Sequence, residues 1–524
     1  MPQGRQFAVT WSIPDDYGGM TAAMLQRSSA FSRLAGTPVY VLTFDARPDT
    51  AELEVRLRER GVLDSGVHLV NLYDWLRGHP LPGGSLRPER DAFTPLGAAD
   101  TTVARRRGGA VMSRTRIDEN GRTLQVDHYR ADGTLVLSDR RDTRRRGVVG
   151  GRSVVLCDAD GRPVRSWARI RPLYEAWLNA LTAGSPSFMI VDSKTIAPFM
   201  VGYRPPHVIT AHVVHASHRS GAGDDHPIRE SRRAVFEQLD GFDLVVVLTR
   251  RQAVDIEGDV GPTPNLVTIP NSRPEPGADV GVARTSREPR DPDRGLVLAA
   301  LTPRKRVSHA IDAVQRARRI AAGADAGAAL RLDVYGDGES RAALERRIGD
   351  DPAVRLHGFD PEARRESATS SFLLLTSQSE GSPLVLVEAM AAGCLPIAYD
   401  IRYGPSDLIR NGRNGFLVPS GDVDGLAASI VHLRRLPAHR VEAMRRAAMR
   451  AAHAFDEERV VRLWARELHR AATRRRLRRS PRLRRVREFA ARSRVAAPAR
   501  AVVVKLVAGF DAGRGSRGRS KTRV

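Results

Sequence analysis

The hydrophobic positions near the start of the chain form short continuous runs separated by amphipathic segments. Residues 7–12, FAVTWS, are typical of a buried strand, and the turn PDDYGG and a helix ending at Gly36 follow them. The pattern repeats with a strand over residues 38–45 and a helix over residues 50–61. Buried strands that alternate with amphipathic helices predict a parallel sheet covered on both faces.

The pattern changes near residue 110, where short alternating segments replace the strand and helix units. The segments RTLQVDHYR, TLVLSD and SVVLCD are separated by turn dipeptides, Asn-Gly at 120 and Asp-Gly at 132 and 160. Such dipeptides between alternating segments are typical of β-hairpins. We therefore predict an antiparallel β-meander inserted into the first α/β region.

The α/β pattern resumes at FMIVDSK, is interrupted by a polar stretch rich in Pro and Arg, and returns from GLVLAAL onward. The fold class predicted is α/β, with two Rossmann-like domains, an antiparallel insertion in the N-terminal half and a basic C-terminal tail. The predicted boundaries are 1–75 and 186–275 for the first domain, 76–185 for the insertion, 276–294 for the linker, 295–470 for the second domain and 471–524 for the tail.

Composition supports a globular protein of two or three domains, with 524 residues and 41% hydrophobic content. Its two cysteines, Cys157 and Cys394, give neither a disulfide framework nor a zinc-binding spacing. No apolar run reaches the ~18 residues that a membrane span needs. The N-terminal residues lack the apolar stretch of a signal peptide, so a cytoplasmic location is expected.

The net charge of +24 is concentrated at the C-terminus, where residues 470–524 contain 19 Lys or Arg against Glu488 and Asp511. Such a tail fits docking to an anionic membrane surface, and each basic residue near that surface adds ~1 kcal/mol. A solvated tail in an arginine-rich protein remains the plain alternative. Nucleic acid is an unlikely partner because no aromatic side chains interleave the charges.

Loops after strands are the places to look for chemistry, because ligands bind at the carboxyl ends of strands in open α/β sheets. Gly18 and Gly19 lie between a strand and a helix, where a phosphate can approach the helix N-terminus, but this loop alone favours an ordinary turn because it lacks a fuller glycine fingerprint. Lys305 is one of only four lysines and follows a strand of the second half. It is either a clamp for a diphosphate or a solvated cation beside Arg304 and Arg306.

Three histidines, His212, His215 and His218, follow a strand at three-residue spacing in HVVHASH. The sequence argues against a metal site here, because no carboxylate or cysteine accompanies these histidines at the spacing typical of zinc ligands. The open alternatives are a structural role and a hydrogen bond from one histidine to substrate. The nearby glycine motif YGDGES lacks the third glycine of a dinucleotide fingerprint.

The segment EGSPLVLVE carries the most specific pattern. Ser382 and Pro383 predict a helix start, whose free backbone N–H groups suit a diphosphate. Glu388 would lie on the second turn and accept hydrogen bonds from paired hydroxyl groups, and Glu380 precedes the turn. An acidic helix start favoured by the macrodipole is the alternative.

These residues resemble a known family. Glu380 and Glu388, with YGDGES, VRLHGF and MAAGCLPIAYDIRYGPSDLIRNGRNGFLV, are similar to retaining GT-B glycosyltransferases of family 4 over most of residues 295–435. In the first half, DYGGMTAAMLQRSS, the β-meander and VVHASH resemble the poly(glycerol-phosphate) α-glucosyltransferases, which decorate wall teichoic acid, and DIRYGPSDLI is similar to that subgroup.

The resemblance implies roles for the donor site. Glu388 would bind the ribose of a UDP-sugar, Glu380 the transferred sugar, and Lys305 the leaving diphosphate. His215 would touch the sugar or the acceptor. The remaining substrate-binding residues would be Gly18, Gly19, Ser382, Pro383, Leu384, Gly358 and Phe359.

The resemblance also implies the reaction and its partners. A hexose or N-acetylhexosamine would move from the UDP-sugar to a polyol-phosphate or other cell-surface polymer, with retained configuration and without a metal or cofactor. The inserted domain would support self-association.

The chain departs from the family at Ala300, which stands where an arginine is usual, five residues before Lys305. Loss of a charged contact to a transferring phosphate would cost several kcal/mol in the transition state. Three explanations follow: compensation by Arg304 or Arg306, a slower enzyme, or a degenerate subunit that binds an acceptor or a partner glycosyltransferase.

Overall fold

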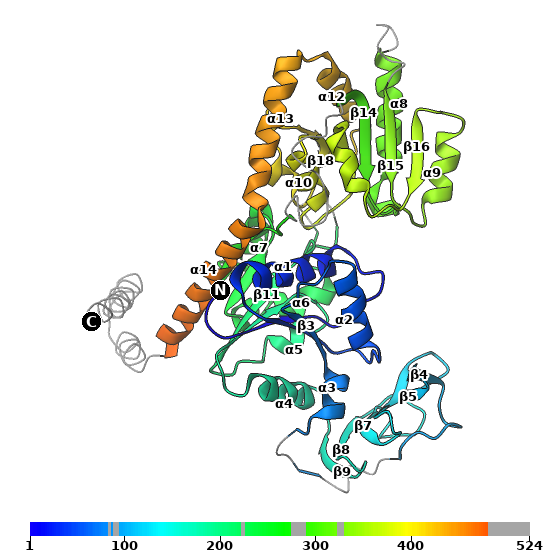
Figure 1. The fold of residues 1–524 in the computed structure, drawn as a ribbon, viewed down its shortest axis with the longest axis vertical. Coiled ribbons are helices and arrows are strands. Elements are labelled where there is room, and N and C mark those ends of the chain that lie inside the picture. Colours follow the sequence, from blue (N-terminus) through cyan, green and yellow to red (C-terminus); the bar gives the residue numbers. More distant parts are fainter. Residues whose placement is uncertain (82–84, 87–93, 222–225, 274–289, 322–329, 480–524) are drawn as a thin grey trace, which may run out of the picture.

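The computed structural model describes residues 1–81, 85–86, 94–221, 226–273, 290–321 and 330–479. Most of the predicted linker and residues 480–524 of the predicted tail lie outside this part of the chain. The described residues form two α/β domains, with a separate antiparallel sheet attached to the first (Figure 1).

The N-terminal domain is built on a parallel sheet with the order β13-β12-β11-β10-β1-β2-β3. Its strands are apolar on both faces, as expected for a sheet that helices cover on both sides. The strands are β1 Arg5–Val9, β2 Val39–Thr43, β3 Val67–Asn71, β10 Ser187–Val191, β11 Val208–Val214, β12 Leu244–Val247 and β13 Leu266–Thr268. The helices are α1 Gly19–Ala35, α2 Thr50–Glu59, α3 Leu72–Gly78, α4 Arg171–Thr182, α5 Ala197–Met200, α6 Glu230–Phe236 and α7 Arg250–Val260.

The inserted sheet is an antiparallel meander in sequence order, from β4 to β9. The predicted turn glycines Gly121, Gly133 and Gly161 have φ angles of 75°, 87° and 79°, the left-handed conformation that the dipeptides predicted. The meander begins at β4, before residue 110. The sequence did not indicate this strand, because it is charged and exposed and lacks an apolar pattern. The strands are β4 Val103–Arg107, β5 Ala110–Ile117, β6 Thr123–Tyr129, β7 Leu135–Arg140, β8 Ser153–Cys157 and β9 Pro163–Trp167.

The C-terminal domain contains a second parallel sheet, with the order β16-β15-β14-β17-β18-β19. Helices cover both of its faces, and its apolar core is separate from the cores of the N-terminal domain. The strands are β14 Asp291–Leu298, β15 Arg331–Tyr335, β16 Val354–Gly358, β17 Ser370–Leu375, β18 Leu395–Asp400 and β19 Phe416–Pro419. The helices are α8 Val307–Ala321, α9 Arg341–Ile348, α10 Leu384–Ala391, α11 Pro405–Leu408, α12 Val423–Arg435 and α13 Ala438–Ala452.

The last described helix, α14 Glu457–Arg479, leaves the C-terminal domain and packs on the N-terminal domain (Figure 1). Its Trp464 meets the ring of Phe31 on α1 at 6.2 Å between centroids. Arg475 pairs with Asp243, which precedes β12. The predicted boundary at residue 470 therefore falls within a helix, and residues 471–479 belong to that docked helix and not to a separate tail.

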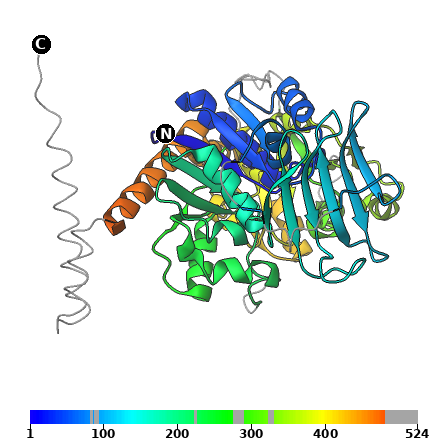
Figure 2. The same cartoon turned by 90° about the horizontal axis from the view of Figure 1, so that it is seen from below.

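Helix α4 lies inside the predicted insertion, residues 76–185, but it packs on the N-terminal sheet. The ring of Trp177 meets Phe44, after β2, at 5.1 Å between centroids. Seen from below, the inserted sheet and α14 lie on opposite sides of the N-terminal domain (Figure 2). None of the helices in the described part of the chain is long and apolar enough to cross a lipid bilayer.

Candidate active site

The predicted donor residues lie on loops that follow strands of the C-terminal sheet. Lys305 ends a short 3-10 turn, Pro303–Lys305, after β14, and Glu380 lies in the loop between β17 and α10. The Lys305 Nζ donates to Glu380 Oε1 at 2.6 Å. Arg304 donates to the backbone carbonyl of Ser379 at 2.6 Å. The structure therefore brings together two residues that lie 75 positions apart and that the sequence assigned to one site.

Helix α10 begins at Leu384, with Pro383 at its N-cap and no side chain capping its free N–H groups. The sequence had placed Pro383 in the first turn, one position further into the helix. A partly exposed helix start with uncapped N–H groups is well suited to an anion.

Glu388 lies on the second turn of α10, and only 16% of its side chain is exposed. Burial raises the pKa of Glu388, and the charge of Arg364 opposes that shift. The Arg364 Nε lies 3.4 Å from Glu388 Oε2. A largely buried carboxylate with an exposed arginine as its neighbour retains lone pairs for further hydrogen bonds.

The two glycines of YGDGES are explained by close contact with the Lys305 loop. A side chain on Gly336 would collide with the carbonyl of Ala299, and one on Gly338 with the carbonyl of Leu301. Ala300 lies between these two contacts and is exposed. An arginine at position 300 would therefore find room without displacing core side chains.

Gly358 and Phe359 lie at the end of β16, beside the same loops. The Gly336 N–H donates to the Gly358 carbonyl at 2.7 Å. The Phe359 side chain is 75% exposed, an unusual position for a large apolar ring. It is available to stack on a planar ligand such as a base.

The three histidines of HVVHASH do not converge on one point. The His212 Nδ1 lies 3.0 Å from the Val191 carbonyl, His215 Nε2 lies 2.7 Å from Asp192 Oδ1, and His218 Nε2 lies 2.9 Å from Asp259 Oδ2. Within the described ranges, no group of three or more His, Cys, Asp or Glu side chains is arranged to hold a metal ion. Each histidine has its own partner.

His215 is held by a buried chain of charges in the N-terminal domain. Both Asp192 oxygens accept from Arg27, at 2.9 and 2.7 Å, and Oδ1 also accepts from His215. Burial would raise the pKa of Asp192, but the charge of Arg27 and the hydrogen bonds from His215 and Arg27 lower it to about 2. An ionised Asp192 fixes the Nε2–H tautomer of His215.

His215 reaches the donor loop across the domain boundary. A side chain on Gly381 would collide with the backbone of His215 and Ala216. The glycine between Glu380 and Ser382 thus lets the loops of the two domains touch. The Lys305–Glu380 pair and the backbone of His215 thus lie at the same contact between the two domains.

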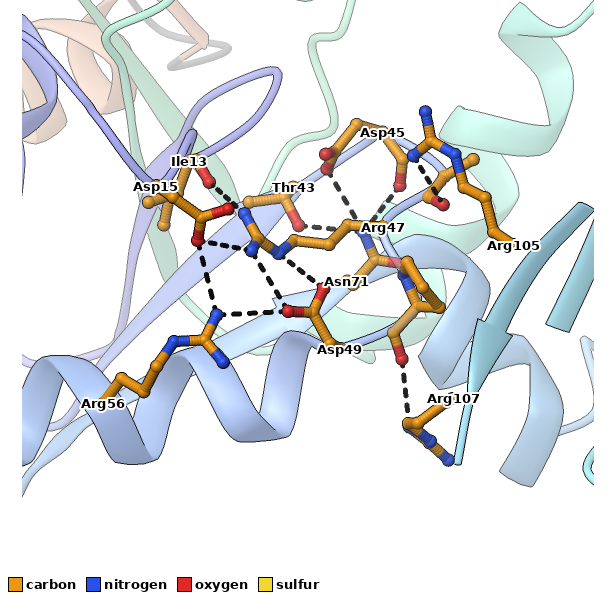
Figure 3. A network of polar contacts seen from close by, with 12 residues as sticks. Ile13, Asp15, Thr43, Asp45, Arg47, Asp49, Arg56, Asn71, Arg105 and Arg107 are labelled. Atoms are coloured by element: carbon orange, nitrogen blue, oxygen red, sulfur yellow. Dashed lines mark hydrogen bonds and ion pairs between the residues drawn. The ribbon is translucent and has the colours of Figure 1, made fainter. Parts of the chain in front are cut away.

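Gly18 and Gly19 lie at the exposed start of α1, and a side chain at either position would meet open space. Arg47 holds the segment before them, donating to the Ile13 carbonyl and to Asp15 Oδ1, both at 2.7 Å (Figure 3). No sequence pattern indicated Arg47. Its role depends on contacts between loops that lie far apart in the chain.

The inserted sheet reaches the same network. Arg105 on β4 donates to the Ala46 carbonyl at 3.2 Å, and Arg107 donates to the Pro48 carbonyl at 3.3 Å (Figure 3). The insertion therefore supports the loop after β2, which in turn supports the loop before α1.

Two Rossmann-like domains whose site loops contact each other are the GT-B fold of glycosyltransferases, and the predicted fold class is confirmed. Residues 293–435 match the family model described as glycosyl transferases group 1. These residues include Lys305, Glu380 and Glu388.

The chain is also similar to curated proteins, of which one is named as a phosphotransferase and two as glycosyltransferases. The chain is 32% identical to an exopolysaccharide phosphotransferase of Streptomyces coelicolor, over 50% of this chain and 27% of the relative. It is 25% identical to a poly(ribitol-phosphate) alpha-N-acetylglucosaminyltransferase of Staphylococcus aureus, over 47% and 48%. It is 21% identical to a poly(glycerol-phosphate) alpha-glucosyltransferase of Bacillus subtilis, over 83% and 70%. The chain thus matches less than half the length of the first two relatives.

Solved structures share the fold over about nine tenths of this chain. The S. aureus TarM complex with Fondaparinux, alpha-GlcNAc-glycerol and UDP is 19% identical with a TM-score of 0.68, covering 89% of this chain and 100% of that one. The GtfA/B complex is 20% identical with a TM-score of 0.62, covering 90% and 100%. The chain therefore shares the GT-B fold of these structures.

Proposed function

We propose that this protein is a retaining glycosyltransferase that moves a hexose or N-acetylhexosamine from a UDP-sugar to a polyol-phosphate or other cell-surface polymer. The observation that carries the proposal is the 2.6 Å pair between Lys305 and Glu380, beside the free start of α10 and the backbone of His215. These groups offer a cation, a carboxylate and N–H donors to one diphosphate sugar.

The reaction breaks the bond between the sugar C1 and the UDP phosphate oxygen and forms a bond from C1 to an acceptor oxygen. The acceptor proton passes to the departing phosphate. Lys305 and the N–H groups of α10 stabilise the charge that develops on that phosphate. Glu380 orients the transferred sugar, and Glu388 accepts hydrogen bonds from the ribose hydroxyls. The proposal includes no metal or cofactor.

The acceptor class rests on relatives. The B. subtilis and S. aureus relatives are named for poly(glycerol-phosphate) and poly(ribitol-phosphate), and the TarM crystal contains alpha-GlcNAc-glycerol and UDP. We extend an anionic polyol-phosphate acceptor to this chain. Self-association through the inserted sheet, a cytoplasmic location and membrane docking through the basic tail belong to the same proposal.

The test measures UDP release from a panel of UDP-sugars, with and without a poly(glycerol-phosphate) acceptor. We expect release from one donor, and a loss of at least ~100-fold in Glu388→Gln, because a neutral amide accepts ribose hydrogen bonds less well than a carboxylate. The matched control is Glu442→Gln, which removes an exposed carboxylate on α13. Equal activity in wild type and Glu388→Gln would refute the assignment of Glu388.

A second function is a subunit without catalysis, which Ala300 favours. The GtfA/B complex shows that a similar fold occurs in an assembly of two named components. Ala300→Arg in the same panel separates the two functions. A wild type that releases no UDP, together with an active Ala300→Arg, would favour the degenerate subunit; an active wild type rules it out.

A further inference from the structure

The segment DIRYGPSD, residues 400–407, runs from the end of β18 into α11 and lies between the two domains. We refer to this segment as the interdomain clasp. The donor site described above does not use any of its side chains. Its contacts nevertheless reach both the N-terminal domain and the backbone of Glu380.

The central contact of the clasp is an ion pair between the domains. Arg402 Nε lies 2.7 Å from Asp255 Oδ2, and the two side chains are only 9% and 13% exposed. Asp255 lies on α7 of the N-terminal domain. Because both charges are largely removed from water, loss of one partner leaves the other poorly compensated.

Two further contacts join the clasp to α7. The Arg251 Nη1 atom lies 2.8 Å from Asp400 Oδ1. The backbone N–H of Arg250, at the first position of α7, donates to Asp407 Oδ1 at 3.0 Å. Asp407 thus accepts from a free N–H group at the start of a helix in the other domain.

The ring of Tyr403 completes the contact with the N-terminal domain. It lies parallel to the ring of His218, with the centroids 6.1 Å apart and the planes 9° apart. Tyr403 is fully buried. The clasp therefore forms a buried contact at its centre, with the more exposed Arg251–Asp400 ion pair at its edge.

The same segment holds the donor loop. The Glu380 N–H donates to the Arg402 carbonyl at 3.0 Å, and the Tyr403 N–H donates to the Glu380 carbonyl at 2.8 Å. A side chain on Gly404 would collide with the ring of Pro383. The backbone of Glu380 is thus fixed on both sides by residues whose side chains bind the N-terminal domain.

We infer that Asp255 is a positioning residue for the donor sugar, acting through Arg402 on Glu380. Contact between the domains holds the clasp, and the clasp holds the carboxylate that would meet the sugar. By thermodynamic reciprocity, a UDP-sugar that binds only when Glu380 is in this position also favours the contact between the clasp and α7. This inference rests on the proposed function for the identity of the ligand.

The test is a double-mutant cycle of Asp255→Asn, Arg402→Gln and the double variant. The affinities for UDP and for the UDP-sugar identified in the donor panel are measured by calorimetry. Small-angle scattering of the unliganded protein gives the radius of gyration. The matched control is Asp312→Asn, which breaks a pair with Arg347 at 2.5 Å inside the C-terminal domain.

Asp255→Asn is expected to weaken UDP-sugar binding roughly tenfold, the usual size of coupling between sites. UDP binding should weaken less, because Glu388 and Lys305 lie outside the clasp. The radius of gyration should increase, and the double variant should resemble either single variant. Asp312→Asn should leave all three measurements unchanged.

Wild-type affinities and an unchanged radius in Asp255→Asn would overturn the inference, as would strictly additive losses in the double variant. An equal loss for UDP and UDP-sugar would assign Asp255 a general structural role instead. If the wild type binds no nucleotide, the proposed function fails. The radius of gyration then still decides whether the Asp255–Arg402 pair holds the domains together.

Discussion

Asp192 is a buried carboxylate whose charge is set by its neighbours and not by solvent. Its side chain is fully buried, yet the pKa of Asp192 is lowered to about 2. Two hydrogen bonds from Arg27 and one from His215 replace the lost water. The same hydrogen bond fixes the ring of His215, whose backbone contacts the loop that carries Glu380.

The change Asp192→Asn tests this arrangement. A depressed carboxyl pKa contributes stability above the ordinary pKa near 4, and that stability is lost as the pH falls toward 2. We expect the free energy of unfolding of the wild type to fall by about 2 kcal/mol in this window because of Asp192, and the variant to lack that part of the slope.

Urea denaturation at pH 7, 4 and 2.5 gives the two slopes. Asp424→Asn, at an exposed position on α12, serves as the control and should follow the wild type. Parallel curves for wild type and Asp192→Asn would contradict the prediction. UDP release should also fall in Asp192→Asn, because the amide no longer fixes the tautomer of His215.

For individual residues, the sequence indicated candidates for the donor site but not the partners that hold the surrounding structure in place. Glu380 and Lys305 were recognisable because each belongs to a local motif beside a strand end. Arg27 and Asp255 were not, because each pairs with a residue more than 100 positions away, and Asp192 was not, because it bridges Arg27 and His215, 165 and 23 positions away. Arg27 and Asp255 lie within helices α1 and α7, Asp192 directly follows β10, and no local motif distinguishes these positions.

Helix α14 joins the two domains through a single apolar face. Val460, Trp464, Leu468 and Ala471 repeat at helical spacing and are buried against the N-terminal domain. The side chain of Arg27 also lies over the Trp464 ring, 5.2 Å from its centroid. Trp464 thus touches both the α1 core and the charge chain that leads to His215.

Trp464→Ala is expected to lower the free energy of unfolding by about 3–5 kcal/mol, the usual cost of removing a buried aromatic side chain. Urea denaturation measures the change. Val55→Ala on α2, where the side chain is 54% exposed, should change it by less than about 0.5 kcal/mol. A similar small effect for Trp464→Ala would show that α14 is not docked in solution.

The elements themselves differed in how well the sequence predicted them. The hairpin turns were predicted correctly because Asn-Gly and Asp-Gly determine a local backbone conformation. The amphipathic spacing in α14 indicates a helix, but spacing contains no information about which domain supplies the partner surface. Strand β4 was missed because its residues, VARRR, are almost all exposed and form no apolar alternation.

For the whole molecule, the uneven charge predicts a surface interaction that depends on salt. Residues 480–524 contain 13 Lys or Arg against Glu488 and Asp511, a net charge of +11. Their removal should weaken binding to vesicles that contain anionic lipid and reduce its salt dependence. Vesicle sedimentation at low and high salt measures both effects.

The point of truncation matters for that experiment. A chain that ends at Arg479 keeps the contact of Arg475 with Asp243, whereas one that ends at residue 470 loses it. Only the first truncation should retain the wild-type unfolding midpoint and UDP release. Unchanged vesicle binding in that variant would contradict a membrane role for the tail.

The return of α14 has a practical consequence for dividing the protein. A fragment of residues 1–273 would lack the helix that covers Phe31 and its neighbours, so it would carry an uncovered apolar surface and a tendency to aggregate. A fragment of residues 290–479 would carry α14 with its apolar face uncovered. Supplying residues 457–479 as a separate peptide should solubilise the first fragment, because this C-terminal helix completes the core of the N-terminal domain. The domain boundary in three dimensions therefore does not coincide with a single cut in the sequence.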